Sequence, residues 1–213
     1  MTINTIKAAQ AIAGTLGNPS KMPGRSYGLP AADAPWVPAA CLADGIPVPP
    51  TYGCAIGAIM VALKGTTCFK CYADARGNYQ YSSVRVAQVR RASGIFHTDW
   101  VPALVRLITA RVDGDDPYFR WHDSGDIQGL WHLEKIASVA MLTPWVHHWM
   151  PTREFKIVRE YLAKHGEFPA NLIVRLSAIK VDAKPPVGYR LTSTVNDTTA
   201  APDHECPARH QDN

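Results

Sequence analysis

PYFRWHDSGD, residues 117–126, is typical of a β-strand that ends in a polar turn. The segment that follows, residues 130–141, predicts an amphipathic helix, because apolar residues recur in it at helical spacing. They are Leu130, Leu133, Ile136, Ala137 and Ala140. A strand, a polar turn and a helix in this order form the repeating unit of proteins with a parallel sheet.

The same alternation extends in both directions along the chain. Strands are predicted over 145–150, 171–177 and 189–195, and amphipathic helices over 83–95, 100–112 and 155–165. Repeated strand and helix units predict an α/β protein with a parallel sheet. The sheet is expected to be open or curled into a partial or full barrel.

Proline sets the N-terminal segment apart from this regular region. Eight of the seventeen prolines fall within residues 18–51, which excludes a long helix or a central strand there. No internal repeat and no linker rich in Gly and Ser divides the chain. We therefore predict one domain over 1–213, with an irregular N-terminal arm (1–53), a cysteine loop (54–81) and an α/β core (82–213).

The composition excludes several classes of protein. With 46% hydrophobic and 19% charged residues, the chain fits a soluble globular protein with a substantial core. Its longest apolar stretch, residues 55–63, is far shorter than the roughly 20 residues of a membrane-spanning helix. Residues 1–14 lack the features of a secretion signal, so we expect a cytoplasmic protein without a membrane partner. The net charge of +4 permits a polyanionic partner without requiring one.

Five cysteines, an odd number, argue against a disulfide framework and favour reduced thiols that bind metal or take part in catalysis. Cys54 is followed by thirteen residues and then by Cys68-Phe-Lys-Cys71. Two cysteines separated by two residues can place both sulfurs on one metal ion or cluster, and Cys54 adds a third thiolate. Two other interpretations are a thioredoxin-like redox pair and a pair of buried apolar cysteines.

Near the C-terminus, Cys206-Pro207 resembles the last ligand of iron–sulfur runs and supplies a candidate fourth thiolate. Three cysteines leave one iron of a four-iron cluster open for a substrate or cofactor, whereas four close the cluster. His204 and His210 are rival ligands, so a zinc site built from Cys and His is an alternative. Cys41 has no partner at a recognisable spacing, and we interpret it as a bystander.

Polar groups also follow three predicted strands, at the places where active groups of such folds collect. A single Asp123 or Ser124 is equally well explained as a helix cap. Three consecutive strand ends that carry such groups favour a site. The candidates are His122, Asp123, Ser124, Asp126, Thr152, Arg153 and Ser177.

Several motifs in combination resemble the phage family catalogued as gene product 88, an essentially uncharacterised family. The resemblance covers most of the chain and, for a phage-encoded protein, implies the host cytoplasm. The motifs are Asn18-Pro-Ser-Lys-Met-Pro-Gly24, Ser26-Tyr-Gly-Leu-Pro30, Cys54-Ala-Ile-Gly57, Cys68-Phe-Lys-Cys71-Tyr-Ala73, Gly77-Asn-Tyr79, Arg120-Trp-His-Asp-Ser-Gly-Asp126 and Thr152-Arg153.

The element Cys68-Phe-Lys-Cys71-Tyr-Ala73, followed by strand and helix units, also looks like the cluster loop of radical S-adenosylmethionine enzymes. The first gap between cysteines is thirteen residues here and three in that family. The resemblance implies a four-iron cluster (4Fe-4S) on Cys54, Cys68 and Cys71, with S-adenosylmethionine on the open iron. It places Tyr72 beside the cluster and implies that His122, Asp123, Asp126 and Arg153 act on cofactor or substrate. We assign Ser124, Thr152 and Ser177 to cofactor binding.

Two alternatives belong to other classes of protein. The loop Asp123-Ser-Gly-Asp-Ile-Gln128 is similar to the Asp-Ser-Gly-Gly-Phe-Gln loop of tRNA-guanine transglycosylases, which implies zinc on the cysteines and acid–base chemistry at Asp123. The other alternative is a metal-stabilised module without catalysis that binds nucleic acid phosphates through arginines. Those arginines are Arg76, Arg85, Arg90, Arg91, Arg106 and Arg111. The substrate itself is not identified by the sequence.

Overall fold

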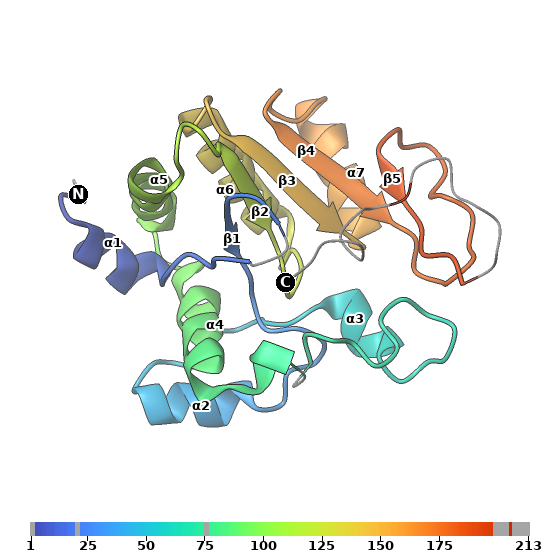
Figure 1. Cartoon of the computed structure of the whole chain (residues 1–213), viewed down its shortest axis with the longest axis horizontal. Coiled ribbons are helices and arrows are strands. Elements are labelled where there is room, and N and C mark those ends of the chain that lie inside the picture. Colours follow the sequence, from blue (N-terminus) through green and yellow to red (C-terminus); the bar gives the residue numbers. More distant parts are fainter. Residues whose placement is uncertain (1–2, 20–21, 75–76, 198–204, 206–213) are drawn as a thin grey trace.

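The computed structural model describes residues 3–19, 22–74, 77–197 and 205 and contains a five-stranded parallel sheet (Figure 1). Its strands are β1 (Arg25–Tyr27), β2 (Tyr118–Trp121), β3 (His147–Thr152), β4 (Leu172–Ser177) and β5 (Thr192–Ser193). They lie side by side in chain order, and every neighbouring pair is parallel. The predicted α/β class is therefore confirmed, with an open, partial-barrel-like sheet.

Helices form two groups around this sheet (Figure 1). α5 (Trp100–Arg111), α6 (Leu130–Leu142) and α7 (Phe155–His165) pack along one face, and α1 (Ile6–Ala13) packs against α5. A second layer lies at the carboxyl edge of the strands. It contains α2 (Val37–Asp44), α3 (Ala55–Met60), the 3-10 helix η1 (Gly77–Gln80) and α4 (Ser82–Gly94).

The N-terminal arm is more regular than predicted. β1 is an edge strand that occupies the gap between Pro23 and Pro30, so no proline interrupts its pairing with β2. Helix α2 places Pro38 in its first turn, where the missing N–H group has no intrahelical partner to lose. Prolines therefore limit the length of these elements without preventing them.

The last predicted strand is much shorter than expected. Residues 189–195 were expected to form a strand, and only Thr192 and Ser193 do. They pair with Leu176 and Ser177, where β4 ends, so no further partner residues are available along that strand. The other predicted strands and helices occur close to their expected positions.

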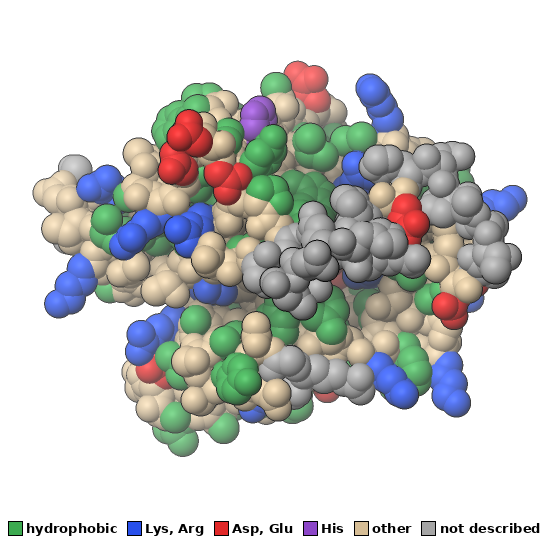
Figure 2. Space-filling view, viewed as in Figure 1, with side chains coloured by type: hydrophobic (Ala, Val, Ile, Leu, Met, Phe, Trp, Pro, Cys, Tyr) green, Lys and Arg blue, Asp and Glu red, His purple; other side chains and the backbone are tan. Residues whose placement is uncertain are grey.

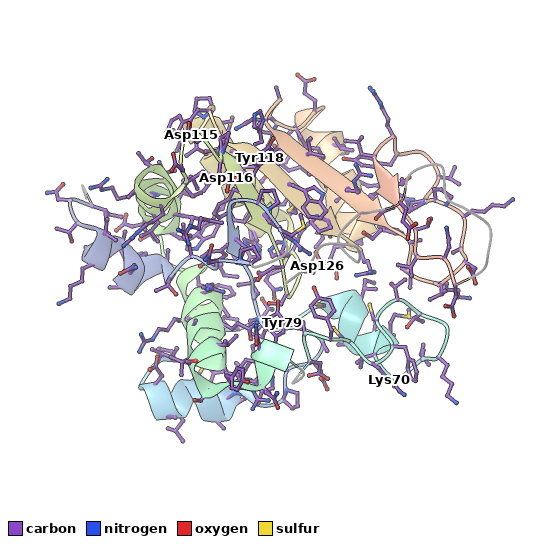
Figure 3. The ribbon with its side chains drawn as sticks, in the orientation of Figure 1. Lys70, Tyr79, Asp115, Asp116, Tyr118 and Asp126 are labelled. Carbon is purple, nitrogen blue, oxygen red and sulfur yellow. The ribbon has the colours of Figure 1, made fainter. Side chains whose placement is uncertain are left out.

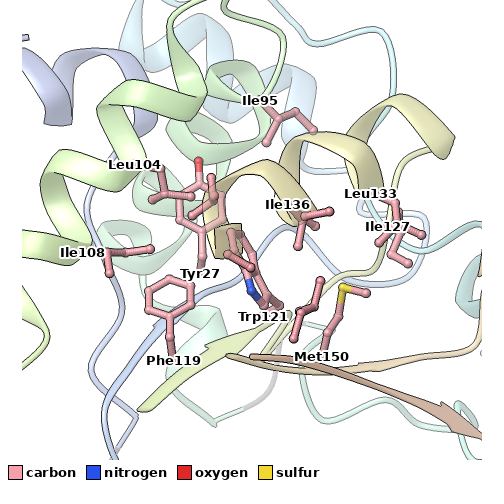
Figure 4. Packing of buried hydrophobic residues seen from close by; sticks show 14 of the residues in the cluster. Tyr27, Ile95, Leu104, Ile108, Phe119, Trp121, Ile127, Leu133, Ile136 and Met150 are labelled. Atoms are coloured by element: carbon pink, nitrogen blue, oxygen red, sulfur yellow. The ribbon is translucent and has the colours of Figure 1, made fainter. Parts of the chain in front are cut away.

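Side chains of β2 point alternately to the hydrophobic core and to the opposite face of the sheet. Phe119 and Trp121 are buried against α5 and α6 beside Tyr27 of β1 (Figure 4). Burial of each such side chain stabilises the fold by roughly 1.5–3 kcal/mol. Arg120, between them in the sequence, points to the other face because side chains alternate along a strand.

Candidate functional site

A cavity of about 380 Å³ opens at the carboxyl edge of the strands, between the sheet and the cysteine loop. The structure brings most of the residues singled out in the sequence to its wall. These are Cys54, Cys68, Cys71, Tyr72, His122, Asp123, Ser124, Asp126, Arg153 and Ser177. Thr152 lies behind Asp126 and does not line the cavity, and Cys206 lies outside the described residues.

One end of the cysteine loop is fastened to the strand ends through α3. The Ile56 N–H, in the first turn of α3, donates to Oε1 of buried Glu154 (3.0 Å), just after β3. Gln128 Nε2 donates to the carbonyl oxygen of Gly53 (2.7 Å), next to Cys54. These bonds hold Cys54 over the ends of β2 and β3.

The other end of the cysteine loop is fastened beyond β4 and β2. The Thr67 N–H donates to the carbonyl of Ile179 (2.8 Å), and the Thr67 hydroxyl contacts the carbonyl of Ala178 (3.2 Å). Tyr72 donates its hydroxyl proton to the carbonyl of Asp123 (2.8 Å). Cys68 and Cys71 are therefore held between two strand ends that are distant in sequence.

Three thiols at one cavity wall suit the soft ligand sets of iron–sulfur clusters and zinc. Burial, together with the nearby Asp126 carboxylate, raises the pKa of Cys54. Burial also raises the pKa of Cys68, against the opposing effect of the Arg153 guanidinium. A bound cation would reverse these shifts, because thiolates are the metal-binding form. Among the described residues, no three His, Cys, Asp or Glu side chains already form a group that could hold a metal ion. Binding would therefore require the cysteine loop to draw its thiols together.

Asp126 is the most heavily hydrogen-bonded group in the cavity wall, and it lies between the sheet and the helical layer (Figure 3). Its Oδ1 accepts from the Thr152 hydroxyl (2.6 Å) and from the Ile127 N–H (2.8 Å), and its Oδ2 accepts from the Arg153 N–H (3.0 Å). Burial raises its pKa, while these three bonds favour the ionised form. Asp126 and Thr152 together join the end of β2 to the end of β3.

Ser124 and Ser177 also make hydrogen bonds within the protein. The Ser124 hydroxyl donates to the carbonyl of Leu29 (2.8 Å) and accepts from Gln88 Nε2 (2.7 Å). The Ser177 hydroxyl is 2.9 Å from that of Ser193 on β5. These bonds join β1 to β2 and β4 to β5, so both serines help to shape the wall.

His122 has a strained backbone and a free imidazole. Its φ is 54°, in the left-handed region that costs energy for a residue with a Cβ and that recurs at functional sites. Neither ring nitrogen has a hydrogen-bond partner among the described residues. Burial, and then the charge of Arg120, lower the pKa of His122 to about 3. At neutral pH the ring is therefore uncharged, and both of its nitrogens are enclosed beside the cavity.

Asp123 is held close to the end of β1. Its Oδ1 is buried without a hydrogen-bond partner in the described part of the chain. A Cβ added at Gly28 would lie 2.1 Å from this oxygen, so only glycine allows β1 to approach so closely. This oxygen therefore lies against the end of β1, while the side chain as a whole forms part of the cavity wall.

Arg120 and Glu154 were not singled out in the sequence. Arg120 lines the cavity and lies over the Trp149 ring, 4.9 Å from its centroid. Side chains alternate between the two faces of a strand, so the predicted strand 117–122 already places Arg120 on the face opposite its apolar neighbours. This pattern could have identified Arg120 as a candidate. Nothing local to Glu154 indicates its bond to Ile56, 98 residues away.

Two arginines of the nucleic-acid alternative are already bonded within the protein. Arg91 is buried and donates to the carbonyls of Thr15 (2.6 Å) and Gly28 (3.2 Å). Arg90 is paired with Asp44. Lys and Arg side chains are scattered around the rim of the face in Figure 2. Arg76 lies outside the described residues.

Cys41 is fully buried in a small apolar cluster with Ala34, Val37 and Val89. Its thiol therefore lies in this small core and does not line the cavity. No helix in the described ranges is long and apolar enough to cross a membrane.

A family model described as Gene product 88 matches residues 4–211. No curated protein and no solved structure matches the chain.

Proposed function

The chain belongs to the Gene product 88 family, and from this premise we propose that it is a phage protein that binds an iron–sulfur cluster at the cavity described above. Cys54, Cys68 and Cys71 would hold a cluster of the four-iron type. The observation that carries the proposal is that the three thiols of the cysteine loop line one cavity together with His122 and Arg153, which follow two different strands. Soft thiolate ligands at such a wall favour a cluster.

The position of the cysteine loop supports a radical S-adenosylmethionine-like enzyme as the finer proposal. The loop follows β1 and precedes β2, and it covers the carboxyl edge of a sheet whose strands keep their chain order. A four-iron cluster on three thiolates supplies an open iron for a substrate or for S-adenosylmethionine. His122 and Asp123 would contact the bound molecule, while Asp126 keeps the wall in place through its three hydrogen bonds.

Metal analysis tests the cluster. After anaerobic purification, we expect a coloured protein with about four irons and four sulfides per chain. A Cys68→Ser, Cys71→Ser double variant should lose both, whereas Cys41→Ala should keep them, because Cys41 lies in a separate core. Unchanged iron in the double variant would exclude this site. A colourless protein with one zinc would exclude the cluster.

A second candidate function rests on Asp123, whose side chain lines the cavity. A carboxylate at a cavity wall is suited to acid–base or nucleophilic work on a nucleobase, with zinc on the cysteines. This candidate predicts one zinc per chain and saturable binding of a free purine base. The Asp123→Asn variant should no longer bind the purine. Iron with purine-independent binding of S-adenosylmethionine would exclude this candidate.

A further inference from the structure

Two arginines line the cavity without forming an ion pair within the described part of the chain. Arg120 and Arg153 both line it, and the Nε of each is buried without a hydrogen-bond partner among the residues that the structure describes. Each side chain is half-buried, and a cation that is partly removed from water without a counter-ion is unfavourable. Two such cations at one cavity favour an anionic ligand.

Each arginine is positioned by its own strand. Arg120 is opposite Trp149 in the β2–β3 register and lies over its ring. Stacking occupies the flat face of a guanidinium and leaves its in-plane N–H groups free for a bidentate partner. Arg153 follows β3, and its backbone N–H is fixed by Asp126 Oδ2 at 3.0 Å. The backbone positions from which both side chains extend are therefore fixed at the cavity.

The balance of charge at the wall favours an anion. Lys70 is a third cation there, and within the described ranges none of the three forms an ion pair. Of the two carboxylates, Asp126 already accepts three hydrogen bonds. Asp123 also lines the wall, so its carboxylate can accept a hydrogen bond from the same ligand.

We propose that Arg120 and Arg153 bind the anionic group, a carboxylate or a phosphate, of the molecule that the cavity takes, while Asp123 accepts a hydrogen bond from that molecule. Planar guanidinium groups match both kinds of anion through paired N–H donors. The inference rests on the proposed function, because the molecule so bound is the one that the metal centre would act on.

Calorimetric titration of the full chain tests the proposal. The probes are inorganic phosphate and succinate, used separately at constant ionic strength. We expect saturable binding of at least one probe, with affinity reduced at least tenfold in Arg120→Gln and in Arg153→Gln. Arg159→Gln, an exposed arginine of α7, is the matched control and should bind as the wild type does. Binding of phosphate alone identifies a phosphorylated ligand, and binding of succinate alone identifies a carboxylate.

The proposal is overturned when neither probe binds, or when Arg159→Gln weakens binding as much as the cavity variants do. Arg120→Lys and Arg153→Lys keep the charge but lose the planar pair of donors, so we expect intermediate affinity from folded proteins. Metal content is measured on the same samples and should not change in the arginine variants. Arginine-dependent anion binding without metal contradicts only the cluster. Metal without anion binding contradicts only this inference.

Discussion

Gly28 is the residue on which the geometry of the cavity wall depends most directly. A Cβ at this position would lie 2.1 Å from Asp123 Oδ1 and 2.7 Å from Ser124 Oγ. We expect Gly28→Ala to lower the free energy of unfolding by about 1–3 kcal/mol, because the strand ends must move apart. Gly114→Ala is the control, since no atom lies within 4 Å of its added Cβ. Urea unfolding measures both, and equal stability of the two variants would contradict this account.

At the residue scale, the sequence predicted which side chains gather but not what each one does. His122, Asp123 and Arg153 could be found because they follow predicted strands. The roles of Ser124 and Asp126 depend on partners such as Leu29, Gln88 and Thr152, which only the folded chain brings near. Arg120 was missed because an arginine within a strand is usually a solvated surface group.

At the element scale, α3 is held by a single carboxylate from another element. We expect Glu154→Ala to loosen α3, because removal of a capping group costs about 0.5–2 kcal/mol. The amide of Ile56 exchanges through local opening of α3, so this loss of free energy should make its hydrogen exchange about two- to thirtyfold faster. Glu160→Ala, on the exposed side of α7, should leave this exchange rate unchanged. A rate equal to wild type in Glu154→Ala would show that Glu154 is not the anchor.

Helices were predicted more accurately than strands, for a physical reason. Helices such as α5 and α6 depend on local apolar spacing, which the sequence displays. A strand depends on a neighbour, and β5 is short because β4 ends at Ser177. The same dependence on partners explains why β1 could not be recognised within the proline-rich arm.

At the scale of the whole molecule, three buried histidines make stability depend on pH. Burial lowers the pKa of His122 to about 3 and that of His148 to about 4, and it holds the pKa of His132 well below its usual value. The unfolded chain, with histidine pKa values of about 6.5, therefore binds more protons below that pH. Stability should be fully present above about pH 6.5 and should fall toward pH 4, by up to about 1.4 kcal/mol per pH unit for each histidine.

Two adjacent residues separate this effect from general acid denaturation. His148 is buried between Trp121 and Thr143, whereas His147 is exposed. The unfolding free energy measured between pH 4.5 and 7 should have a shallower slope in His148→Gln than in wild type. His147→Gln should keep the wild-type slope. Identical slopes in the two variants would show that buried histidines do not account for the pH dependence.

The fastening of the cysteine loop beyond β4 also bears on the order in which the protein matures. Thr67 and Ile179 are 112 residues apart, so Cys68 cannot reach its final position until nearly the whole described chain has been synthesised. Until then Thr67, next to Cys68, lacks the carbonyl groups that fasten it. Any metal centre that needs Cys68 in this position is therefore completed after translation of β4, and a chain truncated before residue 178 lacks the carbonyl groups that fasten Thr67.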